Sequence, residues 1–131
     1  VNVRRADFLN NPEHNTVTID YYKTALNLLL KKIGRNVELY IFSDDISWCK
    51  KNFTFSPRIN FMEENRIGDR YYNYLYLMTC FKNYIIPNSS FAWWGAWLSS
   101  AKNKIVIVPK KWSGLVHEDK IDIVPNSWIK I

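Results

Sequence analysis

Short apolar runs alternate along this chain with longer segments whose apolar residues recur at helical spacing. The short runs predict β-strands at residues 1–4, 37–43, 58–63, 84–87 and 104–109. The longer segments predict helices at residues 20–33, 44–52, 69–83 and 89–100, and the tail from residue 110 predicts irregular structure. Alternating strands and helices are typical of βαβ units, whose strands are parallel. The sequence therefore predicts an α/β fold with a mostly parallel sheet and flanking helices.

Length and composition fit one globular domain with a basic surface. The 131 residues are 47% hydrophobic and 23% charged, with a net charge of +6, which indicates a packed core and excludes a disordered chain. The excess of cations favours an anionic partner: a nucleotide, a nucleic acid or an acidic membrane surface. No apolar run approaches the ~18 residues of a membrane-spanning helix. Cys49 and Cys80 are isolated in the sequence and are predicted to be reduced and buried.

Open parallel sheets bind ligands beyond the carboxyl ends of their strands, so the residues that follow each predicted strand are candidates for a site. They are Arg4, Arg5 and Asp7; Ser43, Asp44 and Asp45; Asn88, Ser89 and Ser90; and Lys110, Lys111 and Trp112. Guanidinium groups bind phosphate oxygens in a bidentate manner. A helix that starts with small polar residues offers backbone N–H groups to an anion. Arginines and a helix start at one sheet edge therefore predict a diphosphate site.

Each of these features also has a plainer interpretation. The paired arginines could form a solvated basic surface, and the Asn-Ser-Ser segment could be an ordinary helix cap. Asp44 and Asp45 could simply start the next helix, where carboxylates are favourable, or they could hold a ribose or belong to an active-site loop. His14 and His117 are isolated and lack ligand spacing, so we expect no protein-held metal.

Three tryptophans, Trp93, Trp94 and Trp97, fall within five residues of the last predicted helix. Trp93 and Trp97 are one helical turn apart and share a face. The periodicity predicts that these rings pack the helix against the sheet and a neighbouring domain, with stacking on a sugar or base as the alternative. The small residues Ala92, Gly95 and Ala96 keep the opposite side thin, which would let the helix lie close to the sheet.

Five blocks of the sequence carry a family resemblance, and the resemblance runs over nearly the whole chain. The blocks are "VRRAD", "IFSDDISWCKKNF", "YLYLMTCFKNYIIPNSSFAWWGAWL", "KIVIVPKKW" and "DIVPNSWIKI". The first resembles an HxRRxD-type motif, and all five, in this order, resemble the α-1,2-fucosyltransferases of glycosyltransferase family 11. The resemblance implies the Rossmann-like, C-terminal half of a GT-B glycosyltransferase. Residues 1–131 would form one GDP-fucose-binding domain, a fragment that lacks the N-terminal acceptor-side domain.

The resemblance also implies roles for individual residues. Arg4 resembles the arginine that holds the β-phosphate of GDP, a catalytic role, while Arg5 and Asp7 complete the motif and Asp7 orients the arginines. Ser89, Ser90 and Phe91, together with the preceding Asn88, resemble the loop-to-helix segment that contacts the diphosphate. Asp44, which follows a predicted strand, is predicted to be a further donor-binding residue. The implied reaction moves L-fucose from GDP-β-L-fucose to a galactose 2-hydroxyl with inversion, without a cofactor or a metal.

Two positions depart from the family pattern. The motif's histidine is replaced by Asn2, and an acidic residue common in the third block is replaced by Tyr74. In related fucosyltransferases the corresponding His and Asp contact guanine. A carboxylate can accept both N–H donors of guanine and a phenol cannot, so the substitutions predict weakened guanine selectivity or activity.

The expected partners are a nucleotide-sugar donor and a galactose-containing glycan acceptor, and not a nucleic acid. The expected location is the cytoplasm, with peripheral attachment to the inner face of the membrane left open. One alternative is an inactive remnant or a sugar- or nucleotide-binding module without catalysis, which the two departures favour. The other is a basic nucleic-acid-binding domain, which would need lysines and aromatic residues interleaved on one face.

Overall fold

Four helices and six strands alternate along the part of the chain that the structure describes. The computed structural model describes residues 1–9, 11, 14, 17–34, 36–56, 58–63, 68, 70–113 and 122–131. The helices are α1 (Ile19–Ile33), α2 (Ile46–Asn52), α4 (Tyr71–Thr79) and α5 (Ser90–Trp97). The strands are β1 (Asn2–Val3), β2 (Leu39–Ser43), β3 (Ile59–Phe61), β4 (Asn83–Ile85), β5 (Ile105–Val108) and β6 (Ile129–Lys130). The α/β class is thereby confirmed.

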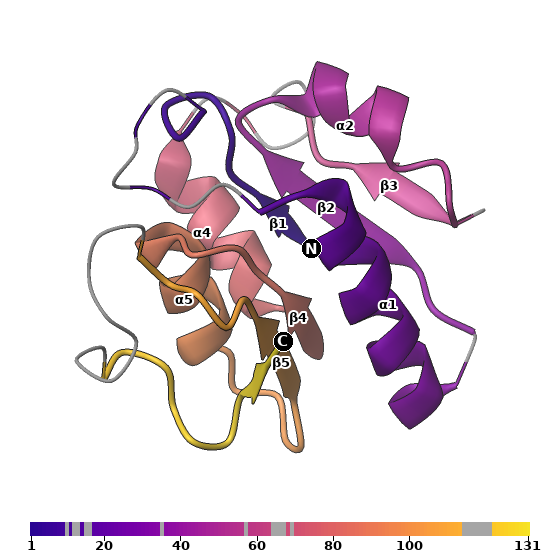
Figure 1. The fold of residues 1–131 in the computed structure, drawn as a ribbon, viewed down its shortest axis with the longest axis vertical. Helices are drawn as coiled ribbons and strands as arrows, with labels where there is room; N and C mark the ends of the chain where they lie inside the picture. Colours follow the sequence, from indigo (N-terminus) through magenta and orange to yellow (C-terminus); the bar gives the residue numbers. More distant parts are fainter. Residues whose placement is uncertain are drawn as a thin grey trace.

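All the strand pairs are parallel, as predicted, but they form two three-stranded sheets instead of one. The first sheet has the order β1-β2-β3 and the second has the order β4-β5-β6. The short strands β1 and β4 are the edges that lie between the two sheets in the fold (Figure 1). The sheets share one core, because Val3 and Ile41 of the first pack in the same cluster as Ile85 and Ile107 of the second.

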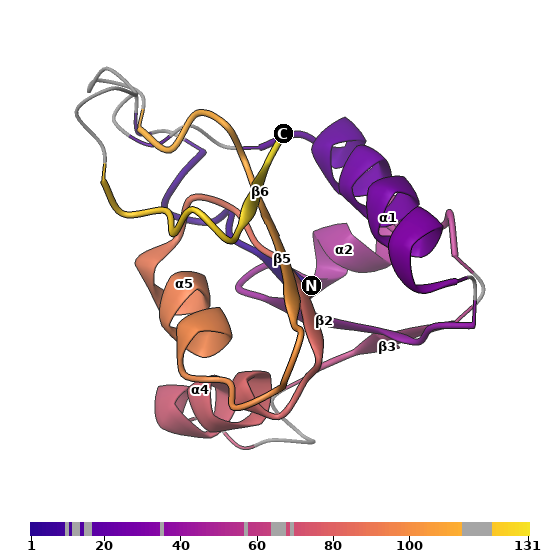
Figure 2. The same cartoon turned by 90° about the horizontal axis from the view of Figure 1, so that it is seen from below.

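Helices cover both faces of the strands, with α1 and α2 on one side and α4 and α5 on the other (Figure 2). Strand β5 is apolar throughout because it is buried on both faces. Ile105 and Ile107 face the cluster that contains α1, while Val106 and Val108 face the cluster that contains α5. Successive side chains of a strand point to opposite faces. A strand between two helical layers therefore needs apolar residues at every position.

Helix α1 follows the predicted pattern closely. Its buried residues are Tyr22, Ala25, Leu26 and Leu29, at the spacing of one helical face. Gly34 ends the helix with a φ of 87°, where a residue without a Cβ is favoured, and its N–H donates to the carbonyl oxygen of Leu30. The helix is also held at its start, because the Tyr21 hydroxyl donates to the carbonyl oxygen of Ile86 at 2.6 Å.

Helix α5 buries its small residues and not all of its tryptophans. Ala92, Gly95 and Ala96 form its buried side, as the thin-side argument expected. Trp94 and Trp97 are about half exposed, at 50% and 49%, so the prediction that the rings pack against the sheet is wrong for these two, while their packing against a neighbouring domain stays a prediction. Their bulk explains the outcome: a Cβ added at Gly95 would already lie 2.8 Å from the Met78 Cε of α4. Only small side chains fit at this helix crossing.

Three further predictions need correction or fall outside the described residues. The C-terminal tail contains strand β6, where irregular structure was predicted. Two paired residues leave too short a pattern to detect, and the pairing depends on contacts such as Ile131 N–H to the Val108 carbonyl oxygen at 3.1 Å. Cys49 is buried as predicted, but Cys80 is exposed because it caps the end of α4. His117 lies outside the described residues.

Candidate nucleotide-sugar site

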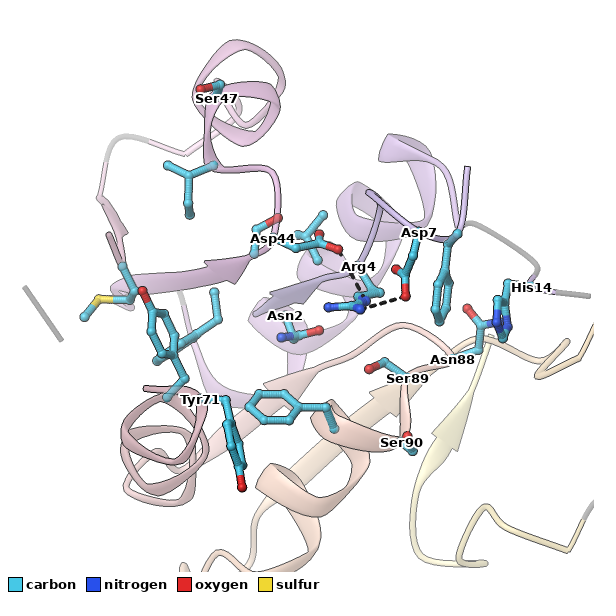
Figure 3. A pocket seen from close by; sticks show the side chains of 18 of the residues that line it. Asn2, Arg4, Asp7, His14, Asp44, Ser47, Tyr71, Asn88, Ser89 and Ser90 are labelled. Carbon is cyan, nitrogen blue, oxygen red and sulfur yellow. Dashed lines mark hydrogen bonds and ion pairs between the residues drawn. The ribbon is translucent and has the colours of Figure 1, made fainter. Parts of the chain in front are cut away.

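A cavity of about 1290 Å³ lies where β1, β2 and β4 end, which is the edge that the parallel-sheet argument selects (Figure 3). Nine of the ten residues predicted for the donor site line it. They are Asn2, Arg4, Asp7, Asp44, Tyr74, Asn88, Ser89, Ser90 and Phe91. Arg4 and Ser89 therefore face one cavity, which confirms that the end of β1 and the start of α5 meet at one site.

Arg4 lines this cavity and is held by two carboxylates. Its Nη2 lies 2.7 Å from Asp7 Oδ2, and its Nε lies 3.3 Å from Asp44 Oδ2. The hydrogen bond to Asp7 raises the pKa of Arg4, and the same bond lowers the pKa of Asp7. The Arg4 side chain is 40% exposed. A guanidinium has five N–H donors, so these two contacts leave donors for an anion in the cavity.

Asp44 does more than pair with Arg4, because it also fixes the backbone that follows β1. Its Oδ1 accepts the Arg5 N–H at 2.9 Å, and its Oδ2 accepts the Ala6 N–H at 3.1 Å. One carboxylate at the end of β2 thus sets both the turn and the direction of Arg4. The prediction offered a helix start as the plainer role for this acidic pair, and it is the neighbouring Asp45 that caps α2, accepting the Trp48 N–H at 2.9 Å.

Arg5 is the predicted residue that does not line the cavity. Its guanidinium lies over the Trp48 ring, 3.8 Å from the ring centroid. Its Nε is 3.6 Å from Asp45 Oδ2, which is an ion pair but too long for a hydrogen bond. The side chain is only 16% exposed. Arg5 therefore ties the turn to α2, and the two adjacent arginines have separate environments.

The start of α5 supplies the other side of the cavity. Ser89 is the N-cap residue, and its hydroxyl accepts the Ala92 N–H at 3.4 Å. The N–H groups of the first helical turn have no acceptor within a helix, and here that turn begins with Ser90 and Phe91, which both line the cavity. The helix dipole adds partial positive charge at this end. Figure 3 shows Ser89 and Ser90 across the cavity from Arg4.

Two buried amide side chains present oxygens that have no hydrogen-bond partner among the described residues. Asn2 is 7% exposed and Asn88 is 6% exposed, and the Oδ1 atom of each is unpartnered. Asn88 is fixed by its Nδ2, which donates to the Trp112 carbonyl oxygen at 2.9 Å. A buried acceptor without a donor costs about 1–3 kcal/mol. Both residues line the cavity, but the two oxygens themselves are buried, so a ligand donor would reach them only after the amide side chains turn.

Aromatic and polar residues from other elements complete the cavity. Tyr74 of α4 meets Phe42 of β2 edge to face, with ring centroids 6.4 Å apart. His14 stacks on Phe8 at 4.1 Å with an interplanar angle of 12°. Ser47, Lys50 and Tyr71 also line the cavity. Sequence reasoning did not select His14 or these three as site residues, because none follows a strand directly, although Ser47 and Lys50 lie within the block "IFSDDISWCKKNF".

The described residues contain no group of three His, Cys, Asp or Glu side chains that could hold a metal ion. Within the same residues, no helix combines the length and the apolar character needed to cross a membrane. Chemically, the cavity offers one oriented guanidinium, a helix N-terminus, two amide side chains at its wall and aromatic rings. That set suits a ligand with anionic and hydrogen-bonding parts.

Known proteins resemble this chain over its whole length. The chain is 34% identical to the O-antigen biosynthesis glycosyltransferase WbnK of Escherichia coli, and 35% identical to an α-1,2-colitosyltransferase of the same species. Each alignment covers the whole of this chain but only 43% and 46% of the relative, so the chain spans about half the length of these curated relatives. No solved structure matches the chain. The profile of glycosyl transferase family 11 matches residues 1–131, and the chain belongs to that family.

Proposed function

We propose that this chain is the donor-binding half of a glycosyltransferase that moves L-fucose from GDP-β-L-fucose to the 2-hydroxyl of a galactoside, with inversion. The chain would be the C-terminal half of a GT-B enzyme. The observation that carries the proposal is the cavity where Arg4 faces the start of α5 beside the unpartnered oxygens of Asn2 and Asn88. Family membership supports glycosyl transfer as the reaction class.

The proposed chemistry follows from where charge develops. As the bond between the sugar and the diphosphate breaks, negative charge grows on the leaving phosphate oxygens. Arg4 and the first-turn N–H groups at Ser90 and Phe91 would stabilise that charge, because donors that are already in place need little reorganisation. The described residues present no clear general base for the acceptor hydroxyl. The leaving phosphate or a residue outside this chain would then take the proton.

Arg4 has free donors for an anion, and releasing Asp7 would add Nη2 to them. Asp7 occupies Nη2 at 2.7 Å, but the Asp7 side chain is 56% exposed and can turn into solvent. Asp44 is 17% exposed and is anchored by two backbone N–H groups, so it stays. The diphosphate would therefore replace Asp7 on the guanidinium while Asp44 continues to hold its direction.

The direct test is a calorimetric titration of the chain with GDP. We expect binding that Arg4→Ala weakens about ten- to a hundredfold, because a charge-assisted hydrogen bond contributes about 1.5–3 kcal/mol. Lys32→Ala is the matched control, since Lys32 is an exposed cation of α1 away from the cavity. Equal GDP affinity in the two variants would remove Arg4 from the site. Binding of GDP by the chain without any transfer by the longer protein would favour a binding module instead.

The sugar has a second candidate. One relative is named an α-1,2-colitosyltransferase, which favours transfer of colitose over fucose by the same cavity and linkage. Incubating the longer protein with the fucosyl and the colitosyl donor, with a galactoside acceptor, separates the two. The product's mass identifies the sugar and its linkage is read by methylation analysis. Transfer to a hydroxyl other than the 2-hydroxyl would contradict the proposed linkage with either donor.

A further inference from the structure

The outward side of α5 carries large apolar side chains in solvent. Trp94, Trp97 and Leu98 are 50%, 49% and 54% exposed. Their spacing of three and four residues places them on one side of the helix, and we call them the α5 outer face. Most surfaces expose single apolar residues, whereas a cluster of this kind marks an interaction site.

The rings of this face are held rigidly. Trp97 stacks on Trp93, with ring centroids 5.1 Å apart and an interplanar angle of 16°. Trp93 is itself anchored, because its Nε1 donates to the Ile123 carbonyl oxygen at 2.8 Å and its ring meets that of Trp128 at 5.6 Å. A partner would therefore meet preformed aromatic surface and would pay little entropy to order it.

The segment that contains α4, β4, α5 and β5 is basic, and the acid nearest to it among the described C-terminal residues is Asp122, beside the Ile123 that Trp93 contacts. Residues 70–113, from the start of α4 to the end of the described segment, contain no Asp or Glu. Their cations are Arg70, Lys82, Lys102, Lys104, Lys110 and Lys111. Lys104 sits at the end of α5, where its Nζ donates to the carbonyl oxygens of Ala96 (2.7 Å), Trp97 (3.0 Å) and Ser99 (2.8 Å).

Three of these lysines lie near the outer face by their place in the fold. Lys82 immediately precedes β4, and Lys102 and Lys104 connect α5 to β5. Helices α4 and α5 both run from the cavity to the opposite edge of the sheet, where β4 and β5 begin (Figure 1). Trp97 and Leu98 end α5 at that edge, whereas Ser89 and Ser90 start it at the cavity. A partner on the outer face would leave the cavity open.

We propose that the α5 outer face and its lysines bind the chain to an anionic lipid surface. Tryptophan and leucine insert at the boundary between headgroups and acyl chains, and lysines are attracted to lipid phosphates. An anionic bilayer would attract Lys82, Lys102 and Lys104 together, whereas a protein surface of mixed charge would match only some of these three cations. The mode is peripheral, with the aromatic side chains entering only the interface.

The test is co-sedimentation of the chain with vesicles. We expect binding to vesicles of equal parts phosphatidylglycerol and phosphatidylcholine, weak binding to phosphatidylcholine alone, and loss of binding in high salt. The tryptophan emission should shift to the blue on binding, and lipids brominated near the headgroup should quench it. Absence of binding to the anionic vesicles would overturn the proposal.

Matched variants assign the binding to this face. Leu98→Ala should weaken binding about tenfold, because it removes apolar area that would enter the membrane interface. Leu9→Ala is the control and should not change binding, because Leu9 is 50% exposed but lies outside this face. Lys102→Glu should weaken binding about five- to tenfold and Lys32→Glu much less, since each basic residue near an anionic surface contributes about a factor of five. Both residues are exposed.

Two outcomes would overturn the assignment even if the vesicles bind. One is equal loss for each variant and its control. The other is a dimer, detected by sedimentation velocity without lipid, that Leu98→Ala dissociates; the face would then bind a second copy of the chain. Circular dichroism of every variant shows that the fold is intact. Because the outer face and the cavity are at opposite edges, failure here leaves the donor-site proposal untouched.

Discussion

Replacing Asp44 by asparagine separates its two tasks, which are to hold the turn after β1 and to orient Arg4. The carboxylate accepts the N–H groups of Arg5 and Ala6 with separate oxygens, and Oδ2 also lies 3.3 Å from Arg4 Nε. Asparagine has one acceptor oxygen and one NH2 group. It can keep a single backbone bond, and its NH2 group then faces a donor.

The size of the effect follows from these contacts. A hydrogen bond to a charged group contributes about 1.5–3 kcal/mol, and partial exposure reduces that figure. We expect Asp44→Asn to lower the free energy of unfolding by about 1–2 kcal/mol, which for a domain of this size lowers Tm by about 3–6 °C. GDP affinity should fall about tenfold, since Arg4 loses the group that fixes its direction.

Asp7→Asn is the matched control, because Asp7 also contacts Arg4 but is 56% exposed. We expect less than about 0.5 kcal/mol of destabilisation, as is usual for an exposed ion pair. GDP affinity should stay the same or rise, because Arg4 Nη2 becomes free for phosphate. Urea denaturation and calorimetry on both variants give the four values. Equal effects of the two substitutions on stability and on GDP affinity would refute the reasoning.

Three further predictions concern the contact between α4 and α5, the two cysteine thiols, and the recognition of guanine. Gly95→Ala should lower stability by about 1 kcal/mol, because its Cβ would lie 2.8 Å from Met78 Cε and 3.0 Å from Met78 Cβ; in a Met78→Ala background the same change should stabilise, by helix propensity. Burial raises the pKa of Cys49 to about 11, so at pH 8 about one part in a thousand of this thiol is thiolate. Ellman's reagent should therefore titrate one thiol in the folded protein, the exposed Cys80. It should titrate the second thiol only in denaturant. Tyr74→Asp should raise the preference for GDP over ADP about ten- to a hundredfold; a native preference above a hundredfold, unaltered by the change, would show that guanine is read elsewhere.

The fold was predictable wherever one segment carried a complete local pattern. The run 104–109 and the helix ending at Gly34 each contain their own periodicity and their own end signal. Strand β6 has neither, since its two residues pair only because β5 offers an open edge. The division into two sheets is likewise absent from the sequence. It depends on how the short edge strands β1 and β4 approach, which is a tertiary property.

The site was predictable through topology more than through motifs. The rule that parallel strands end at a common edge was enough to bring Arg4, Asp44 and Ser89 together. The rule failed for Arg5, because its side chain points away from that of Arg4 and packs over the Trp48 ring. Nor could the sequence show that the amide oxygens of Asn2 and Asn88 are buried without a donor. Burial of a single atom depends on neighbours that come from distant segments.

The tryptophans of α5 are where volume misled the prediction. A large apolar ring is usually buried, and on that basis Trp94→Ala would cost about 3–5 kcal/mol. The structure instead buries Ala92 and Ala96, because the crossing with α4 has no room for more, and leaves Trp94 50% exposed. We now expect Trp94→Ala to cost about 2 kcal/mol, since only half of the ring's area is removed from water. Trp128 is only 7% exposed, so Trp128→Ala should cost about 3–5 kcal/mol. Urea denaturation measures the free energy of unfolding of both variants. An equal loss of stability in Trp94→Ala and Trp128→Ala would contradict this account.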